Sequence, residues 1–295
     1  MNKKGLITVN TYYYRDEVKY QIERFSTEFK KYDIELEVRP CNSLLGYIVE
    51  GEIQLFDFDY DFVIYLDKDK YLSTLLEKAG VRVFNKAWQT DICDEKMMSH
   101  LMLANQGIKM PTTISGALCF KDTEFSKDLL EQLETVLGYP LIIKESYGSM
   151  GKSIMMVNDR EELLAIMPGI MKKPHLFQQY IKSSHGKDIR VMVIGKKFCA
   201  AMYRESAKDF RSNLSNGGNA SKIEVPAEFV AMAEKVAEIL DLDYCGVDIM
   251  FGENGEPIFC EVNSNAFITN LEKISEVNVA AIYCEYIYKE IYEGK

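Results

Sequence analysis

The sequence has few of the residues that build disulfide frameworks, thiolate metal centres or membrane spans. It contains three histidines and seven cysteines, and no two cysteines form a Cys-x-x-Cys pair. An odd number of scattered cysteines predicts reduced thiols and argues against a structural zinc site. No run approaches the ~20 apolar residues of a membrane helix, and the apolar run after Lys3-Lys4 is too short for a signal peptide. We expect a soluble cytoplasmic protein.

Basic charge is also scarce, because the 295 residues carry a formal net charge of −10. This balance argues against nucleic acid or an anionic membrane as a partner, although it leaves room for a local basic pocket. Apolar residues make up 47% of the chain and charged residues 27%, which is ordinary for a globular protein. The length favours more than one domain.

Residues 1–88 alternate between short apolar runs and amphipathic segments. Such alternation predicts a parallel sheet with helical crossovers, and therefore a small α/β domain. We expect strands at 6–9, 34–38, 62–66 and 81–84, and helices at 16–32, from Asn42 or Ser43 to about 50, and at 71–79.

The rest of the chain favours two α+β parts, at 89–179 and 180–295. Acidic residues Asp91, Asp94 and Glu95 crowd the expected start of a helix that runs to about 106, where they would complement the helix dipole. We expect further helices at 124–137, 159–171, 228–240 and 276–292, and strands at 112–115, 141–145, 154–157, 175–179, 189–194 and 198–204.

A hairpin between Cys245 and Asn265 organises the last part. Asn254-Gly255 between two alternating runs predicts a two-residue type I′ turn. That register places Met250 opposite Phe259. It also puts Val247, Ile249, Phe251, Ile258, Cys260 and Val262 on one apolar face, and Asp248, Glu261 and Asn263 on the other.

The polar face predicts a metal site. Asp248 and Glu261 would form a non-hydrogen-bonded pair with Cα atoms ~4.5 Å apart, and like charges so placed are destabilising. A hard cation such as Mg²⁺ would offset the repulsion, with oxygen ligands from Asp248, Glu261 and Asn263. The alternative is that both acids point into water at a sheet edge.

A glycine-rich loop lies between two expected strands. Residues 146–153 nearly match a P-loop, ending in Gly151-Lys152-Ser153. A P-loop must open a helix, whereas the next four residues favour a strand. We interpret the loop as a flap whose backbone N–H groups close over phosphates; an ordinary mobile hairpin loop is the alternative.

Basic side chains surround this arrangement in the sequence. Lys144 lies two residues before the loop and Lys96 lies in the first turns of a helix, while Arg190, Arg204 and Arg211 share the last third with the paired acids. Arginine commonly binds phosphate or carboxylate through two parallel N–H groups of its guanidinium. Solvated lysines and structural salt bridges are the alternatives. Together with the flap and the acids, the set suits phosphoryl transfer.

The motifs after residue 90 form an ordered series. They are Glu95-Lys96-x-x-Ser99 with Gly107-Ile108-x-x-Pro111, Lys144 with Gly148-Ser149-x-Gly151, Gln179-Tyr180-Ile181, Asp188-Ile189-Arg190, Asp209-Phe210-Arg211-Ser212-Asn213 with Gly217-Gly218, Gly246-Val247-Asp248 and Glu261-Val262-Asn263. In order and spacing they resemble the ATP-grasp superfamily and, within it, the RimK-like carboxylate–amine ligases. The resemblance implies an ATP-grasp fold, in which an N-terminal α/β (pre-ATP-grasp) domain precedes two α+β subdomains that clamp ATP.

The resemblance also implies roles for single residues. Lys96 and Lys144 would contact the ATP phosphates under the flap. The other nucleotide-binding residues would be Gly148, Ser149 and Gly151 in the flap, Gln179, Tyr180 and Ile181 at adenine, Asp188 at ribose, and Arg190. The Mg²⁺ ligands would be Asp248, Glu261 and Asn263, and Arg204, Arg211 and Asn213 would face the transferred phosphoryl group.

The implied reaction is ATP- and Mg²⁺-dependent amide formation, with Mn²⁺ as a possible substitute. A carboxylate would form an acyl phosphate, which an amine, glutamate above all, would then attack. The carboxylate would belong to a small molecule or peptide, and we expect a homo-oligomer. The chain departs from the family at Gln179, where a glutamate is usual, at Lys152-Ser153 and after Asn263. The rival interpretations are a nucleotide-binding regulatory or scaffold protein without turnover, and a P-loop kinase.

Overall fold

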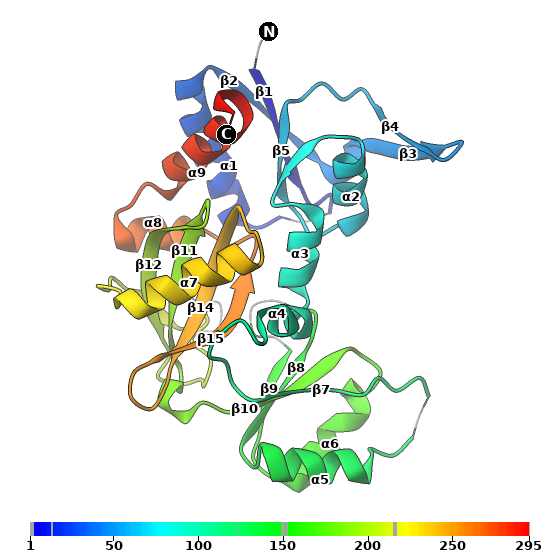
Figure 1. Ribbon diagram of the computed structural model, residues 1–295, viewed down its shortest axis with the longest axis vertical. Coiled ribbons are helices and arrows are strands. Elements are labelled where there is room, and N and C mark those ends of the chain that lie inside the picture. Colours follow the sequence, from blue (N-terminus) through cyan, green and yellow to red (C-terminus); the bar gives the residue numbers. More distant parts are fainter. Residues whose placement is uncertain are drawn as a thin grey trace.

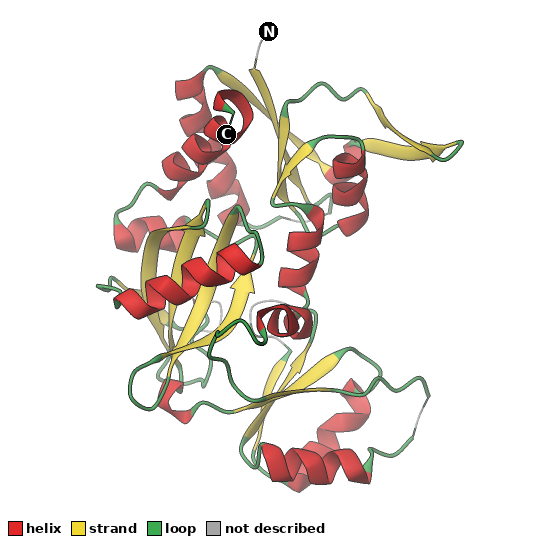
Figure 2. Ribbon diagram, in the orientation of Figure 1, coloured by secondary structure: helices red, strands yellow, loops and turns green. Residues whose placement is uncertain are grey.

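The computed structural model describes residues 3–12, 14–121, 123–148, 151, 153–214 and 217–294. Figure 1 shows three parts, each built on its own main sheet, with the central part at the opposite end from the chain termini. Figure 2 shows that helices flank each sheet. This mixed α/β and α+β architecture is the predicted fold class.

A parallel sheet forms the N-terminal part, as predicted. α1 (Asp16–Phe29) packs on one face, where Phe25 and Phe29 contact Ile7 and Ile64. α2 (Lys70–Lys78) packs on the other face and ends before Gly80. The sheet order is β2-β1-β5-β6, with β1 Lys3–Val9, β2 Ile34–Pro40, β5 Phe62–Leu66 and β6 Arg82–Phe84; the helices are α1 Asp16–Phe29 and α2 Lys70–Lys78.

The predicted helix from Asn42 or Ser43 to residue 50 is wrong. A short 3₁₀ turn, Cys41–Ser43, leads into a hairpin of β3 (Leu45–Val49) and β4 (Glu52–Phe56). β-branched and aromatic residues favour the strands. Glu50 and Gly51 both have positive φ, 51° and 88°, which is the requirement of a type I′ turn.

The expected long helix around residues 91–106 is two helices, α3 (Ala87–Asp94) and α4 (Lys96–Leu103). Asp91 and Asp94 therefore lie at the end of α3 and not at the start of a helix. Only Glu95 has the predicted place, because it caps α4 by accepting a hydrogen bond from the Met98 N–H at 2.6 Å.

The central sheet is antiparallel and lies on α5 (Lys127–Val136) and α6 (Arg160–Ile170), as Figure 1 shows. Its core holds Leu133, Ile143, Met167 and Phe177. The order is β7-β10-β8-β9, with β7 Thr113–Ser115, β10 His175–Gln179, β8 Leu141–Glu145 and β9 Ile154–Val157. The strand β9 directly after the glycine-rich loop excludes a P-loop, which needs a helix there.

The C-terminal sheet is also antiparallel, and α7 (Ala227–Ile239) covers one face. The sequence did not predict β13 (Asn219–Ser221) or α8 (Thr269–Ser275). The predicted last helix begins at Val279 as α9 (Val279–Tyr288) and continues into a π-helical turn, Lys289–Glu293. The order is β13-β12-β11-β14-β15, with β13 Asn219–Ser221, β12 Lys197–Glu205, β11 Lys187–Ile194, β14 Tyr244–Phe251 and β15 Pro257–Asn263.

One hydrophobic core joins the N-terminal and C-terminal parts. The ring of Phe25 on α1 meets that of Tyr283 on α9 edge-on, with centroids 5.5 Å apart. Met192 and Met202 of the C-terminal sheet belong to the same cluster. The α1 and α9 helices thus fix the N-terminal sheet beside the C-terminal one. The boundaries at 88 and 179 stay a prediction.

Candidate active site

The β14–β15 hairpin has the predicted Asp248–Glu261 pairing but not the predicted turn. Its loop has three residues, 253–255, closed by a hydrogen bond from the Gly252 N–H to the Glu256 carbonyl at 2.7 Å. In this loop only Gly255 has positive φ, 84°. A three-residue loop shifts the register by one, so Ile249 and not Met250 lies opposite Phe259.

A register shift between Asp248 and Ile249 then restores the predicted pairing. Because Cys260 is the extra residue, the expected faces of Ile258 and Cys260 are wrong. Phe259 packs in the core with Ile249, and Cys260 lines the cavity beside Met250. Burial raises the pKa of Cys260 to about 12, so this thiol stays protonated.

Two arginines already balance the buried carboxylate of Asp248. Arg190 donates from Nε to Oδ1 and from Nη2 to Oδ2, both at 2.7 Å, and Arg204 Nη2 lies 2.9 Å from Oδ2. Burial would raise the pKa of Asp248, but the two guanidinium groups outweigh it and hold that pKa well below its ordinary range. The sequence suggested that a metal ion alone offsets the repulsion between Asp248 and Glu261. The two arginines show that the acid pair does not depend on a metal ion alone.

Asp188, the expected ribose ligand, faces Arg204 across β11 and β12. Its carboxylate accepts from Arg204 Nε at 2.8 Å and Nη2 at 2.6 Å, and from Ser212 Oγ at 2.6 Å. Burial would lower the pKa of Arg204, but the carboxylates of Asp188 and Asp248 hold that pKa well above the ordinary value. Arg204 is thus a fixed, buried cation between two acids.

The oxygen atoms of Asp248, Glu261 and Asn263 suit a magnesium ion. Asn263 Nδ2 lies 3.4 Å from Glu261 Oε1, so its amide is beside the Glu261 carboxylate. Asp248 Oδ1 accepts from Arg190 Nε, which leaves one lone pair for a metal. Mg²⁺ is usually held by one or two carboxylates together with substrate phosphates. Within the described ranges, no three His, Cys, Asp or Glu residues group as a metal site, so phosphate would have to complete this one.

The described residues of the flap contact two basic side chains. Lys96 Nζ donates to the Gly148 carbonyl at 2.6 Å, and Arg211 Nη1 donates to the Gly151 carbonyl. Lys96 and Lys144 are 8% and 5% exposed. Burial lowers the pKa of Lys96, partly offset by Glu261. Ser149 and Lys152 lie outside the described residues.

A cavity between the central and C-terminal sheets brings most of the predicted nucleotide site together. Ile142, Ile154 and Met250 give it apolar walls. Among the predicted residues, it is lined by Lys144, Gly151, Gln179, Tyr180, Ile181, Asp188, Arg204, Arg211, Asn213, Asp248 and Glu261. Lys96 and Gly148 are absent from its wall but bond each other at the flap.

A second cavity of about 410 Å³ adjoins the first. Arg204, Asn213 and Glu261 line both cavities, and Arg190 and Asn263 line the second. Its far wall comes from residues for which the sequence gave no motif. These are Arg15 with Glu17 at 2.7 Å, and Lys68 paired with Asp94.

Sequence reasoning also missed His100, which links α4 to the central sheet. Its Nδ1 lies 2.8 Å from the Lys96 carbonyl, and its Nε2 lies 3.0 Å from Gln178 Nε2. Because the amide nitrogen of Gln178 can only donate, Nε2 accepts and the proton is on Nδ1. Burial, followed by the charge of Lys144, lowers the pKa of His100 to about 4.

The neutral state of His100 predicts acid sensitivity. Its ordinary pKa is 6.5, so below that pH the unfolded chain binds a proton that the folded protein refuses until about pH 4. The free energy of unfolding should therefore fall by about 1.4 kcal/mol per pH unit as the pH drops through this window. Urea unfolding between pH 7 and 4 measures this, and His100→Gln should reduce the slope. An equal slope in both proteins contradicts the assignment.

The architecture is that of ATP-grasp ligases. The fold resembles the ATP-grasp ligase PsnB complexed with minimal precursor, with a TM-score of 0.73 and 16% identity over 98% of this chain and 100% of that one. D-alanine–D-alanine ligase from Bacillus anthracis, complexed with ATP, gives 0.71 and 20% identity, over 99% and 97% of the two chains.

The profile of the RimK-like ATP-grasp domain matches residues 93–287, and the chain belongs to this family. Human N-acetylaspartylglutamate synthase A is 33% identical over 75% of this chain, which spans 56% of that protein. A probable alpha-L-glutamate ligase of Maridesulfovibrio salexigens is 33% identical over 74% of this chain and 71% of its own length. These relatives support ATP-dependent amide-bond formation. No helix in the described part of the chain has the length and apolar character to cross a membrane.

Proposed function

We propose that this protein is an ATP- and Mg²⁺-dependent ligase that joins glutamate to a carboxylate of a small molecule or peptide. The observation that carries the proposal is the shared wall of the two cavities. Arg204, Asn213 and Glu261 face both, so a carboxylate in the second cavity would meet the γ-phosphate in the first.

The reaction has two steps. The substrate carboxylate attacks the γ-phosphate, and ADP leaves with the β–γ bridging oxygen. The amine then attacks the carbonyl carbon of the acyl phosphate, loses a proton and expels inorganic phosphate. Arg204 and Arg211 neutralise the charge that gathers on the transferred oxygens, and Asp188 and Asp209 hold these guanidinium groups in place. A magnesium ion, when bound, would neutralise the phosphate oxygens at Glu261 and Asn263.

The backbone at the end of β10 would contact adenine. The Gln179 N–H already donates to the Thr112 carbonyl at 2.9 Å, and the Ile181 carbonyl accepts from Ser184 at 3.0 Å. We therefore assign the adenine contact to the Gln179 carbonyl and the Ile181 N–H. Because Asp188 is held by Arg204 and Ser212, a ribose contact at Asp188 would share its carboxylate oxygens with them.

The names of the relatives support glutamate as the amine. They include N-acetylaspartylglutamate synthase A and beta-citrylglutamate synthase B, both human, and the probable alpha-L-glutamate ligase. Residues 1–88, which supply Arg15 and Lys68 to the second cavity, would choose the carboxylate. On this proposal residues 89–179 and 180–295 are the two halves of the ATP clamp.

A paired library tests the proposal. The protein is mixed with ATP, Mg²⁺, single amino acids, and pooled carboxylic acids and peptides, and both phosphate release and product mass are measured. We expect release only with a matching pair, and a product whose mass is the sum of the two substrates minus water. ATP binding without release in any pool would favour the nucleotide-binding regulatory protein.

Two lysine variants distinguish an ATP-grasp nucleotide site from a P-loop nucleotide site. Lys144→Ala removes a buried cation from the cavity wall, and we expect the Kd for ATP to rise about tenfold or more, ~1.4 kcal/mol. Lys152→Ala, the P-loop position, should have a milder effect. Calorimetric titration with a non-hydrolysable ATP analogue measures both, and a larger loss in Lys152→Ala contradicts the account.

A further inference from the structure

The β3–β4 hairpin, residues 45–56, projects from the N-terminal part as an arm, and Figure 1 shows it reaching away from the rest of the molecule. Its two strands pair with each other and with no other strand of the described chain. An isolated two-stranded hairpin is only marginally stable in water. The arm packs one face on α2, where Leu55 joins the core and Leu75 contacts Gly46.

The other face of the arm is uncovered and presents large apolar side chains beside two polar ones. The register pairs Tyr47 with Gln54 and Val49 with Glu52 on this face, and Phe56 follows on the same side of β4. Phe56 is 67% exposed, and Tyr47 and Val49 are 40% and 42% exposed. Ile48, at the tip of the opposite face, is 67% exposed. Large exposed apolar groups gathered on one element mark an interaction surface.

The edges of the arm have little of the usual protection against pairing. Natural edge strands are blunted by charged side chains, lysine above all, or by proline or bulges. The one charged residue on β3 and β4 is Glu52, at the tip of the arm. Residues 41–61 contain no lysine, arginine or proline, and the β3–β4 register is regular. The arm can therefore add an extended segment as a third strand.

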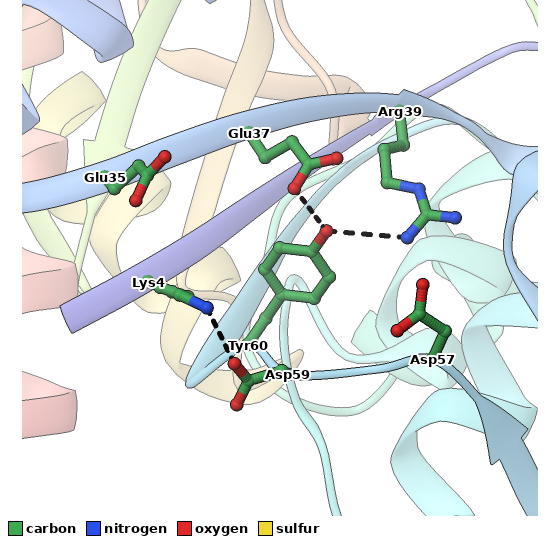
Figure 3. A pocket seen from close by; sticks show the side chains of 7 residues that line it. All are labelled: Lys4, Glu35, Glu37, Arg39, Asp57, Asp59 and Tyr60. Atoms are coloured by element: carbon green, nitrogen blue, oxygen red, sulfur yellow. Dashed lines mark hydrogen bonds and ion pairs between the residues drawn. The ribbon is translucent and has the colours of Figure 1, made fainter. Parts of the chain in front are cut away.

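The charge around the arm selects the occupant. Residues 41–61 contain five acids and no basic side chain: Glu50, Glu52, Asp57, Asp59 and Asp61. At the base of the arm, Asp57 and Asp59 line a cleft of about 530 Å³ with Glu35 and Glu37 of β2. Figure 3 shows these carboxylates around Tyr60, whose hydroxyl lies 2.5 Å from Glu37 Oε2 and 3.5 Å from Arg39 Nη1.

The cleft holds more negative than positive charge. Its two cations are Lys4, which pairs with Asp59 at 2.7 Å, and Arg39, against four carboxylates. A second copy of this chain is disfavoured, because arm against arm would bring like charges together and the whole chain carries −10. An apolar strand with basic side chains matches both the arm and the cleft.

We propose that the arm and cleft dock an extended, cationic segment of a partner protein. The segment pairs with an edge of the arm, lays apolar side chains on Tyr47, Val49 and Phe56, and places a lysine or arginine among Glu35, Glu37 and Asp57. This docking is separate from the nucleotide site and does not rest on the ligase function.

Peptide binding without ATP tests this proposal. The probe is a fluorescent peptide of alternating valine and lysine, compared with its valine–glutamate counterpart by anisotropy with the full chain. We expect binding of the lysine peptide only, weakening as salt is raised. Phe56→Ser, and Glu35→Gln with Asp57→Asn, should each weaken it about tenfold or more, whereas Glu161→Gln on exposed α6 should leave it unchanged.

Unchanged circular dichroism and melting temperature show that each variant is folded. Hydrogen exchange adds a second readout, since strand addition should protect backbone amides within residues 45–56. Equal binding of both peptides, no binding of either, or unchanged affinity in both arm and cleft variants overturns the proposal. So does a dimer in sedimentation that Phe56→Ser dissolves, because the arm would then be covered by a second copy. None of these outcomes bears on ligase turnover.

Discussion

Glu261→Gln is expected to lower kcat by about 10²-fold or more while the protein stays folded. Glu261 faces both cavities and has Asn263 beside it, so its charge lies where the phosphoryl group would cross. Glutamine keeps the size of the side chain and removes only the charge. Because Asp248 lies directly opposite, losing that charge also removes a repulsion.

The same variant separates a catalytic effect from a structural one. Without Mg²⁺ its melting temperature should equal or exceed that of the wild type, and added Mg²⁺ with ADP should raise it less than in the wild type. Glu256→Gln on the same hairpin is the matched control, because the Glu256 carboxylate binds Lys109 Nζ at 3.1 Å and the Asn254 N–H at 3.0 Å and lines neither cavity. Normal turnover by Glu261→Gln would place the metal elsewhere.

Asn85→Ala is expected to have the largest effect on stability, about 3–5 kcal/mol. Asn85 is 2% exposed and uses its whole amide. Nδ2 donates to the Tyr244 carbonyl at 2.7 Å and the Ser264 carbonyl at 2.9 Å, and Oδ1 accepts from the Asp243 and Tyr244 N–H groups at 2.9 and 3.0 Å. Alanine would leave four buried backbone groups unpaired.

This loss should also reach the active site. Ser264 follows Asn263, so Asn85 ties the start of β14 to the end of β15, where the proposed metal ligands lie. Urea unfolding gives the stability change, and kcat at low temperature shows the effect on turnover. Asn158→Ala, at an exposed amide that bonds Glu162 at 3.0 Å, should cost little. A change below about 1 kcal/mol at Asn85 would show that water replaces its bonds.

The pairing of Asp248 with Glu261 was predicted correctly, although the two-residue turn from which it was derived does not form. The Asn254-Gly255 rule gave a two-residue turn, while the chain forms a three-residue loop and a later bulge that cancel. The loop and the bulge change the alternation of the residues between them, so the faces predicted for Ile258 and Cys260 are wrong. A type I′ turn occurs instead at Glu50-Gly51, where the sequence has no Asn-Gly pair to predict it.

Long-range partners could not be predicted from local patterns. Arg190 and Arg204 were expected near phosphate. The register of β11 with its two neighbouring strands places Arg190 opposite Asp248 and Arg204 opposite Asp188. The second cavity is lined from residues far apart in sequence, such as Arg15 and Phe267. His100 and Asn85 carry no motif, because their roles arise only when α4, β10, β14 and β15 come together.

The most direct test of the central claim follows an oxygen atom from the substrate carboxylate. With a pair identified in the library, the carboxylate is labelled with ¹⁸O and the released phosphate is analysed by mass spectrometry. Attack on the γ-phosphate predicts one ¹⁸O in each phosphate, one in the amide carbonyl, and ADP as the other product. Unlabelled phosphate, or AMP with pyrophosphate, would contradict an acyl phosphate formed at the wall of Arg204, Asn213 and Glu261.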